Sequence, residues 1–125
     1  MARLERPHVL LVEDDCDTRE MYSRYLSDSG MTVTEARTGR RALETLRTQR
    51  PDVVVTDIAM PEMDGLELSR RLRAEMPTRD VPIIAVSGQA VESSSVPAAD
   101  MVLEKPCEPA RLVKAINQVL NQRRR

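Results

Sequence analysis

Short apolar segments recur along the chain, and their spacing predicts strands. They lie at His8–Val12, Met31–Ala36, Val53–Thr56, Pro82–Val86 and Met101–Leu103. Unbroken apolar runs of this length are typical of parallel strands that are covered on both faces. The second segment instead alternates between apolar and polar residues, which predicts a less buried, flanking strand.

Between these segments the apolar residues take up helical spacing. Their expected inward positions are Met21, Tyr22, Tyr25, Leu26, Ala42, Leu43, Leu46, Leu68, Leu72, Met76, Leu112, Val113, Ile116, Val119 and Leu120. Gln89–Asp100 is serine-rich and lacks this periodicity, so a short or irregular fourth helix is expected there. Strands that alternate with helices predict an α/β fold, a doubly wound parallel sheet with helices on both faces. No linker or repeat divides residues 1–125, which indicates one domain.

The composition narrows the class of protein. The chain has 125 residues, of which 41% are hydrophobic, 31% charged and only 2% aromatic, so a folded domain with an aliphatic core is expected. A net charge of −1 gives no electrostatic case for nucleic acid or an anionic membrane as a partner. With no signal peptide and no membrane-length apolar run, the expected location is cytoplasmic. Cys16 and Cys107 lack metal-site spacing and are expected to be reduced thiols.

Polar side chains follow the strand ends. Glu13 and Asp14 follow the first strand, Asp57 ends the third, Ser87 ends the fourth and Lys105 follows the fifth. Because the carboxyl ends of parallel strands share one edge of the sheet, these groups are expected to converge. Three carboxylates brought together repel one another unless a cation intervenes. A hard divalent ion with oxygen ligands, Mg²⁺ above all, fits that arrangement.

The remaining groups suit phosphoryl chemistry. Lys105 supplies a positive point charge and Ser87 a hydroxyl, which together could hold the oxygens of a phosphoryl group. Asp57 is then the natural nucleophile and would form an acyl phosphate. The lysine, the hydroxyl and Mg²⁺ would stabilise negative charge during in-line transfer.

Four motifs carry a resemblance to a known family. LLVEDD, VVVTDIAMPEMDG, IIAVSG and LEKP resemble, in this order, the receiver domain of two-component response regulators. The resemblance spans essentially the whole chain and implies a flavodoxin-like strand order of 2-1-3-4-5. It implies that Asp57 accepts phosphate from the phosphohistidine of a sensor histidine kinase or phosphotransfer protein. It also implies a signalling receiver, not an enzyme, which assists its own phosphorylation and dephosphorylation and signals to a downstream protein or effector domain.

The resemblance also implies roles for individual residues. Asp14 matches the direct Mg²⁺ ligand, Glu13 an acid that acts largely through water, and Asp57 a further ligand. The backbone carbonyl of Ala59 falls where the family completes its metal site. Ser87 matches the hydroxyl that switches position after phosphorylation.

Lys105 matches the family's lysine, but three departures lie near it. Val102 replaces a rotating aromatic residue, and Cys107 replaces a phenylalanine. The separation of Ser87 from Lys105, 105 − 87 = 18 positions, is a few residues short. A valine is too stiff to swing as a ring does. The surface from Gln89 to Lys105 is therefore expected to switch without a rotating aromatic.

Other functions remain alternatives at this point. A pseudo-receiver that binds proteins without phosphorylation would explain Val102 and the weak fourth helix. A Mg²⁺-dependent phosphohydrolase of the haloacid-dehalogenase type would need a second acid two positions after Asp57, where this chain has Ala59. A flavin protein is poorly supported, because no aromatic residue lies near the loops.

Overall fold

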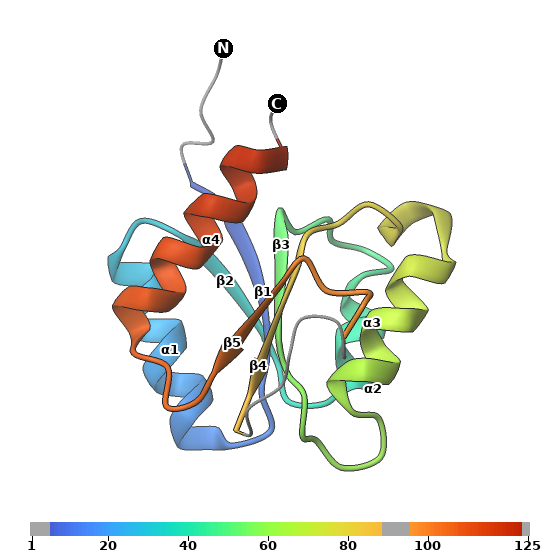
Figure 1. Cartoon of the computed structure of the whole chain (residues 1–125), viewed down its shortest axis with the longest axis horizontal. Helices are drawn as coiled ribbons and strands as arrows, with labels where there is room; N and C mark the ends of the chain where they lie inside the picture. The colour runs from blue at the N-terminus through green and yellow to red at the C-terminus, as the bar shows by residue number, and fades with distance from the viewer. Residues whose placement is uncertain (1–5, 89–95, 124–125) are drawn as a thin grey trace.

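The computed structural model describes residues 6–88 and 96–123, which form one parallel sheet with helices around it (Figure 1). The elements are β1 (His8–Val12), α1 (Cys16–Asp28), β2 (Thr32–Ala36), α2 (Gly39–Thr45), β3 (Val53–Asp57), α3 (Gly65–Ala74), a 3-10 helix η1 (Met76–Thr78), β4 (Ile83–Ser87), β5 (Met101–Glu104) and α4 (Pro109–Arg123). All strand pairs are parallel, and the order is β2-β1-β3-β4-β5. The predicted doubly wound, flavodoxin-like sheet is confirmed.

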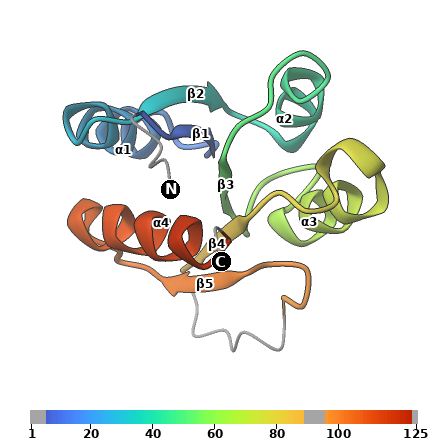
Figure 2. The ribbon, with the colours of Figure 1, turned by 90° about the horizontal axis from the view of Figure 1, so that it is seen from above.

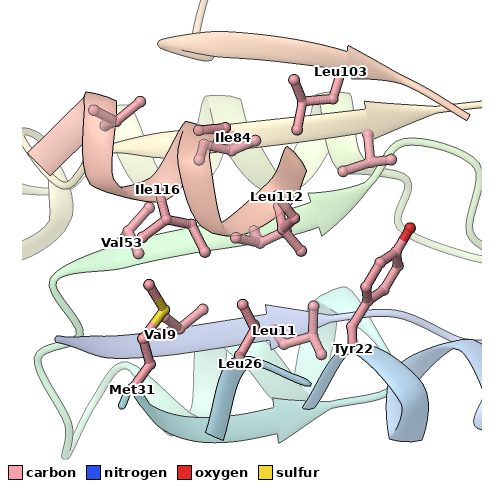
Figure 3. Packing of buried hydrophobic residues seen from close by; sticks show 14 of the residues in the cluster. Val9, Leu11, Tyr22, Leu26, Met31, Val53, Ile84, Leu103, Leu112 and Ile116 are labelled. Atoms are coloured by element: carbon pink, nitrogen blue, oxygen red, sulfur yellow. The ribbon is translucent and has the colours of Figure 1, made fainter. Parts of the chain in front are cut away.

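The sheet separates two apolar cores. Figure 2 shows α1 and α4 on one face and α2 and α3 on the other. Successive side chains of a strand point to opposite faces, so Val9 and Leu11 join the α1/α4 core while Leu10 and Val12 join the α2/α3 core. Figure 3 shows part of the α1/α4 core, where helix residues such as Leu112 pack on the strands. The central strands are buried on both faces, as their unbroken apolar runs predict.

The edge strand β2 and the serine-rich segment Gln89–Asp100 agree with their sequence patterns only in part. β2 is partly exposed, as its alternating residues predict. The fourth helix that was expected within Gln89–Asp100 falls mainly on residues 89–95, which lie outside the described residues. Val96–Asp100 forms turns and bends instead of helix. The label α4 therefore belongs to the last helix of the chain.

Three of the expected inward positions are wrong. Met21 and Tyr25 of α1 are 44% and 41% exposed, because only Tyr22 and Leu26 lie on the stripe that faces the sheet. Met76 is 73% exposed, since α3 ends at Ala74 and Met76 lies in η1. Pro77 cannot donate the backbone hydrogen bond that would continue the helix.

The start of α3 fixes the end of β3. Asp64 caps the helix by accepting a hydrogen bond from Glu67 N at 2.8 Å. Gly65 follows it, and a side chain at this position would collide with the carbonyl of Asp57. Because Gly65 has none, α3 packs directly against the strand end that carries Asp57.

Two further sequence expectations concern the thiols and membranes. Neither cysteine is in a disulfide; Cys16 is exposed and Cys107 is buried. Across residues 6–88 and 96–123, none of the helices has both the length and the apolar character needed to span a bilayer.

Candidate functional site

Three carboxylates meet at the carboxyl edge of the sheet. β1 and β3 are neighbours, so Glu13 and Asp14, just after β1, come close to Asp57 at the end of β3. One carboxylate oxygen from each residue lies within 4.8 Å of the others. Glu13 and Asp57 are buried, 4% and 6% exposed, whereas Asp14 is exposed. The cluster therefore has two protected acids and one that faces solvent.

Lys105 reaches into this cluster from the loop after β5. Its Nζ lies 3.2 Å from Asp57 Oδ2 and 3.5 Å from Glu13 Oε1. Burial alone would lower the pKa of Lys105, but the charges of Asp57 and Glu13 outweigh burial and raise it. The lysine is thus held as a cation beside two carboxylates.

The single positive charge of Lys105 does not balance the carboxylates of the acidic cluster. Burial, with a smaller contribution from the charge of Asp57, raises the pKa of Glu13, although the Asp15 N–H and Lys105 act in the opposite direction. Asp57 Oδ1 is buried and has no hydrogen-bond partner within the described parts of the chain. A buried, unpaired carboxylate oxygen is costly. The donor set is composed of oxygens and is short of positive charge, which fits a hard divalent cation such as Mg²⁺.

Two further site residues were predicted, Ser87 and Ala59, and each lies at or just after the end of a strand. Ser87 is buried at the end of β4, one position beyond Val86, which pairs with Asp57 across the sheet. Ala59 is exposed in the loop that follows β3, two positions after Asp57. The expected switching role of Ser87 and the expected metal-ligand role of the Ala59 carbonyl stay predictions.

Two residues that received no role from the sequence support Glu13. The Asp15 N–H donates to Glu13 Oε2 at 3.0 Å, and the Asp15 carboxylate caps α1 through Thr18. Arg19 donates through Nη1 to the Glu13 carbonyl at 2.9 Å. An aspartate directly before the first residue of a helix is a typical N-cap, and this signal could have indicated Asp15. No comparable pattern marks Arg19.

The fold and the site together define the class of protein. The fold is a parallel, flavodoxin-like sheet, and the site has clustered acids and a lysine at the carboxyl edge of that sheet. The model of the response regulator receiver domain matches residues 9–117. The chain belongs to this family, the receiver domains of two-component systems, which are signalling modules that bind Mg²⁺ at their acidic site.

Individual relatives agree with this assignment. The chemotaxis protein CheY of Thermotoga maritima is 33% identical, over 89% of this chain and 95% of that protein. The receiver domain of a sensor histidine kinase from Pseudomonas aeruginosa, solved with a magnesium ion coordinated in its active site cleft, has a TM-score of 0.85. It is 28% identical, and the match covers 93% of this chain and 98% of that one.

Other relatives are longer than this chain. The transcriptional regulatory protein CseB of Streptomyces avermitilis is 38% identical over 94% of this chain, but the match covers only 51% of CseB. The chain thus spans about half the length of several curated relatives that it matches.

Proposed function

We propose that this chain is a phosphorylatable response-regulator receiver, in which Asp57 accepts a phosphoryl group from a phosphohistidine in a Mg²⁺-dependent reaction. The donor would be a sensor histidine kinase or a phosphotransfer protein. One observation carries the proposal: Lys105 Nζ lies 3.2 Å from Asp57 Oδ2, while Asp57 Oδ1 is buried without a partner in the described residues. In this arrangement the lysine cation orients one carboxylate oxygen of the nucleophile, and the other oxygen can still act as an acceptor.

The expected chemistry uses the residues at the sheet edge. A carboxylate oxygen of Asp57 attacks phosphorus, and the bond from phosphorus to the imidazole nitrogen breaks. Lys105 and Ser87 would hold the oxygens of the phosphoryl group as charge moves during transfer. Asp14, Asp57 and the Ala59 carbonyl would hold Mg²⁺, with Glu13 acting through water. The ion would supply positive charge against the phosphoryl oxygens.

The output would leave through the surface from Gln89 to Lys105. The Lys105 amide donates to the Ser87 carbonyl at 2.6 Å, and Ser87 pairs with Glu104 across β4 and β5. Movement of Ser87 toward a phosphoryl group would therefore be transmitted to β5. A downstream protein or effector domain would read this change, and nucleic acid and membranes are not expected to bind directly. A single receiver domain over residues 1–125 and a cytoplasmic location belong to the same proposal.

Acetyl phosphate with Mg²⁺ tests the proposal directly. Intact mass should increase by one phosphoryl group, and the modified residue should map to Asp57. Asp57→Asn should remove the modification, and EDTA should suppress it. Asp64→Asn is a matched control, because asparagine caps α3 as well as aspartate does and the site is unchanged.

A wild-type protein that folds, binds Mg²⁺ and still takes up no phosphoryl group would refute the proposal. That outcome would favour the pseudo-receiver alternative. Modification that persists in Asp57→Asn would refute the assignment of the acceptor.

A further inference from the structure

Tyr22 makes a buried contact that the proposed chemistry has not yet used. It is 5% exposed, whereas Tyr25, the other tyrosine of the chain, is 41% exposed. The Tyr22 hydroxyl donates to the carbonyl of Cys107 at 2.6 Å, across a separation of 85 positions. Figure 3 shows the ring beside Leu11 and Leu26, with its hydroxyl toward the ends of the strand arrows. The contact therefore lies near the sheet edge that carries the acidic cluster.

The acceptor of this hydrogen bond lies in the loop that carries Lys105. Cys107 is two positions after Lys105, between the end of β5 and the start of α4. The same loop is held on its other side, because the Lys105 amide donates to the Ser87 carbonyl at 2.6 Å. The backbone around Lys105 is thus fixed at two points, one on β4 and one on α1.

The same helix also holds the acid opposite the lysine. Arg19, one turn before Tyr22 on α1, donates to the Glu13 carbonyl at 2.9 Å. Residues three apart in a helix share a face. α1 therefore holds the main chain on both sides of the Lys105–Glu13 pair, with Arg19 on the Glu13 carbonyl and Tyr22 on the carbonyl of Cys107, two positions after Lys105.

Fixing the backbone matters because the lysine side chain is long and flexible. Its ammonium group sits on four rotatable carbons, so its position over Asp57 depends on where the main chain starts. Without the Tyr22 hydroxyl, the carbonyl of the buried Cys107 would lose the donor that the structure gives it. Burial, together with the neighbouring Cys107 thiol, raises the pKa of the Tyr22 phenol, so the hydroxyl keeps the proton that it donates.

We propose that Tyr22 is a positioning residue for Lys105, acting through the Cys107 carbonyl to hold the ammonium group over Asp57. This inference rests on the proposed function for its effect on phosphorylation, but the positioning itself does not. A resting protein should already show it.

The test compares Tyr22→Phe with Tyr25→Phe. The first substitution removes the buried hydroxyl and keeps the ring, and the second does the same at an exposed site on the same helix. The chain has only two lysines, Lys105 and Lys114, so side-chain NMR of labelled lysine gives two resolvable ammonium groups. Backbone amide spectra of each variant would first establish that the fold is retained.

At a single pH and without metal, Tyr22→Phe should shift the Lys105 signals and increase the side-chain motion of Lys105, while the Lys114 signals stay unchanged. Phosphorylation by acetyl phosphate at saturating Mg²⁺ should slow by about threefold to thirtyfold, because a misplaced group loses its advantage of orientation. Tyr25→Phe should match the wild type in both measurements.

The outcomes separate the two proposals. If Lys105 becomes more mobile in Tyr22→Phe but even the wild type is not phosphorylated, the proposed function fails and the positioning role stands. If the Lys105 signals in folded Tyr22→Phe equal those of the wild type, the positioning role is overturned, whatever happens to the rate.

Discussion

Arg73 and Lys105 each bind a carboxylate near one end of β5, but the groups that surround the two cations differ. Arg73 Nη2 lies 2.9 Å from Asp100 Oδ2, just before β5 begins. Asp100 Oδ2 also accepts the Ile83 N–H at 2.8 Å. Three further guanidinium N–H groups donate to main-chain carbonyls, those of Ala98, Arg79 and Val81, at 3.0, 2.8 and 2.6 Å.

Lys105, just after β5 ends, has the opposite surroundings. It faces two carboxylates instead of one, and an oxygen of Asp57 is left without a partner in the described residues. Arg73 donates its hydrogen bonds to loops of the same chain and holds these loops together. The Lys105 site keeps acceptor capacity that the described chain does not use. Unused capacity of this kind distinguishes a ligand site from a structural ion pair.

The largest expected effect comes from removing the cation at the unsatisfied site. Lys105→Ala should slow phosphorylation of Asp57 by about 100-fold, the usual effect of removing one preorganised group that stabilises transition-state charge. Its free energy of unfolding should change by only about 0–1 kcal/mol, because the lysine is partly exposed. Rates with acetyl phosphate and urea titrations measure the two effects. Lys114→Ala, at an exposed position of α4, is the matched control and should change neither.

Removing Arg73, the cation of the satisfied site, should affect mainly stability, which is the reverse of the effect expected for Lys105. Arg73→Ala should lower the free energy of unfolding by about 2 kcal/mol, because main-chain carbonyls and Asp100 lose their donor. Arg71→Ala breaks only an exposed pair with Glu67 among the described residues, and its expected cost is about 0.3–0.5 kcal/mol. Urea titration measures both. Equal losses in the two variants would show that the Arg73 contacts do not stabilise the loops.

The sequence could predict the sheet and the edge that carries the acids. Unbroken runs such as Val53–Thr56 specify buried parallel strands, and parallel strands bring their ends to one edge whatever the loops do. Glu13, Asp57 and Lys105 lie together for that reason. Their separation along the chain did not matter, because topology brings strand ends together.

The supporting contacts could not be predicted in the same way. The hydrogen bond from Tyr22 to Cys107 spans 85 positions. Its acceptor is a main-chain carbonyl, which every residue has, so no sequence pattern indicates it. The Arg73 contacts depend likewise on how loops approach one another. The exposure of Met21 was missed because apolar spacing indicates which side of a helix faces the sheet but not how wide the buried stripe is.

Magnesium should distinguish the two sites at equilibrium. At ten times its dissociation constant, Mg²⁺ should raise the free energy of unfolding of the wild type by about 1.4 kcal/mol, since it binds only the folded cluster. Asp14→Asn should lose most of this gain, because it removes one of the three clustered carboxylates. Asp100→Asn should keep the gain even if its baseline stability is lower. Urea titrations with Mg²⁺ or EDTA supply the comparison, and a full gain in Asp14→Asn would contradict the metal site.

The smallest expected effect is the pH dependence that Glu13 contributes. Burial raises the pKa of Glu13 above its ordinary value of 4.5 in the folded state. Its contribution to stability is therefore fully present below pH 4.5 and is lost as the pH rises through the raised pKa. In EDTA at pH 7, Glu13→Gln should be more stable than the wild type by about 0.5–1 kcal/mol, because it removes a buried charge that Lys105 only partly compensates. The difference should shrink as the pH falls through the raised pKa of Glu13 and should have disappeared below pH 4.5.

Urea titrations across this pH range measure the difference, and Glu20→Gln, at an exposed acid on α1, supplies the control. Mg²⁺ should reduce the advantage of Glu13→Gln, because a bound cation compensates the same charge in the wild type. If Glu13→Gln is less stable than the wild type at pH 7 in EDTA, then Lys105 already satisfies the acids. The contrast between the Lys105 site and the Arg73 site would then be smaller than their hydrogen bonds indicate, because both cations would be fully paired with acceptors of the unliganded protein.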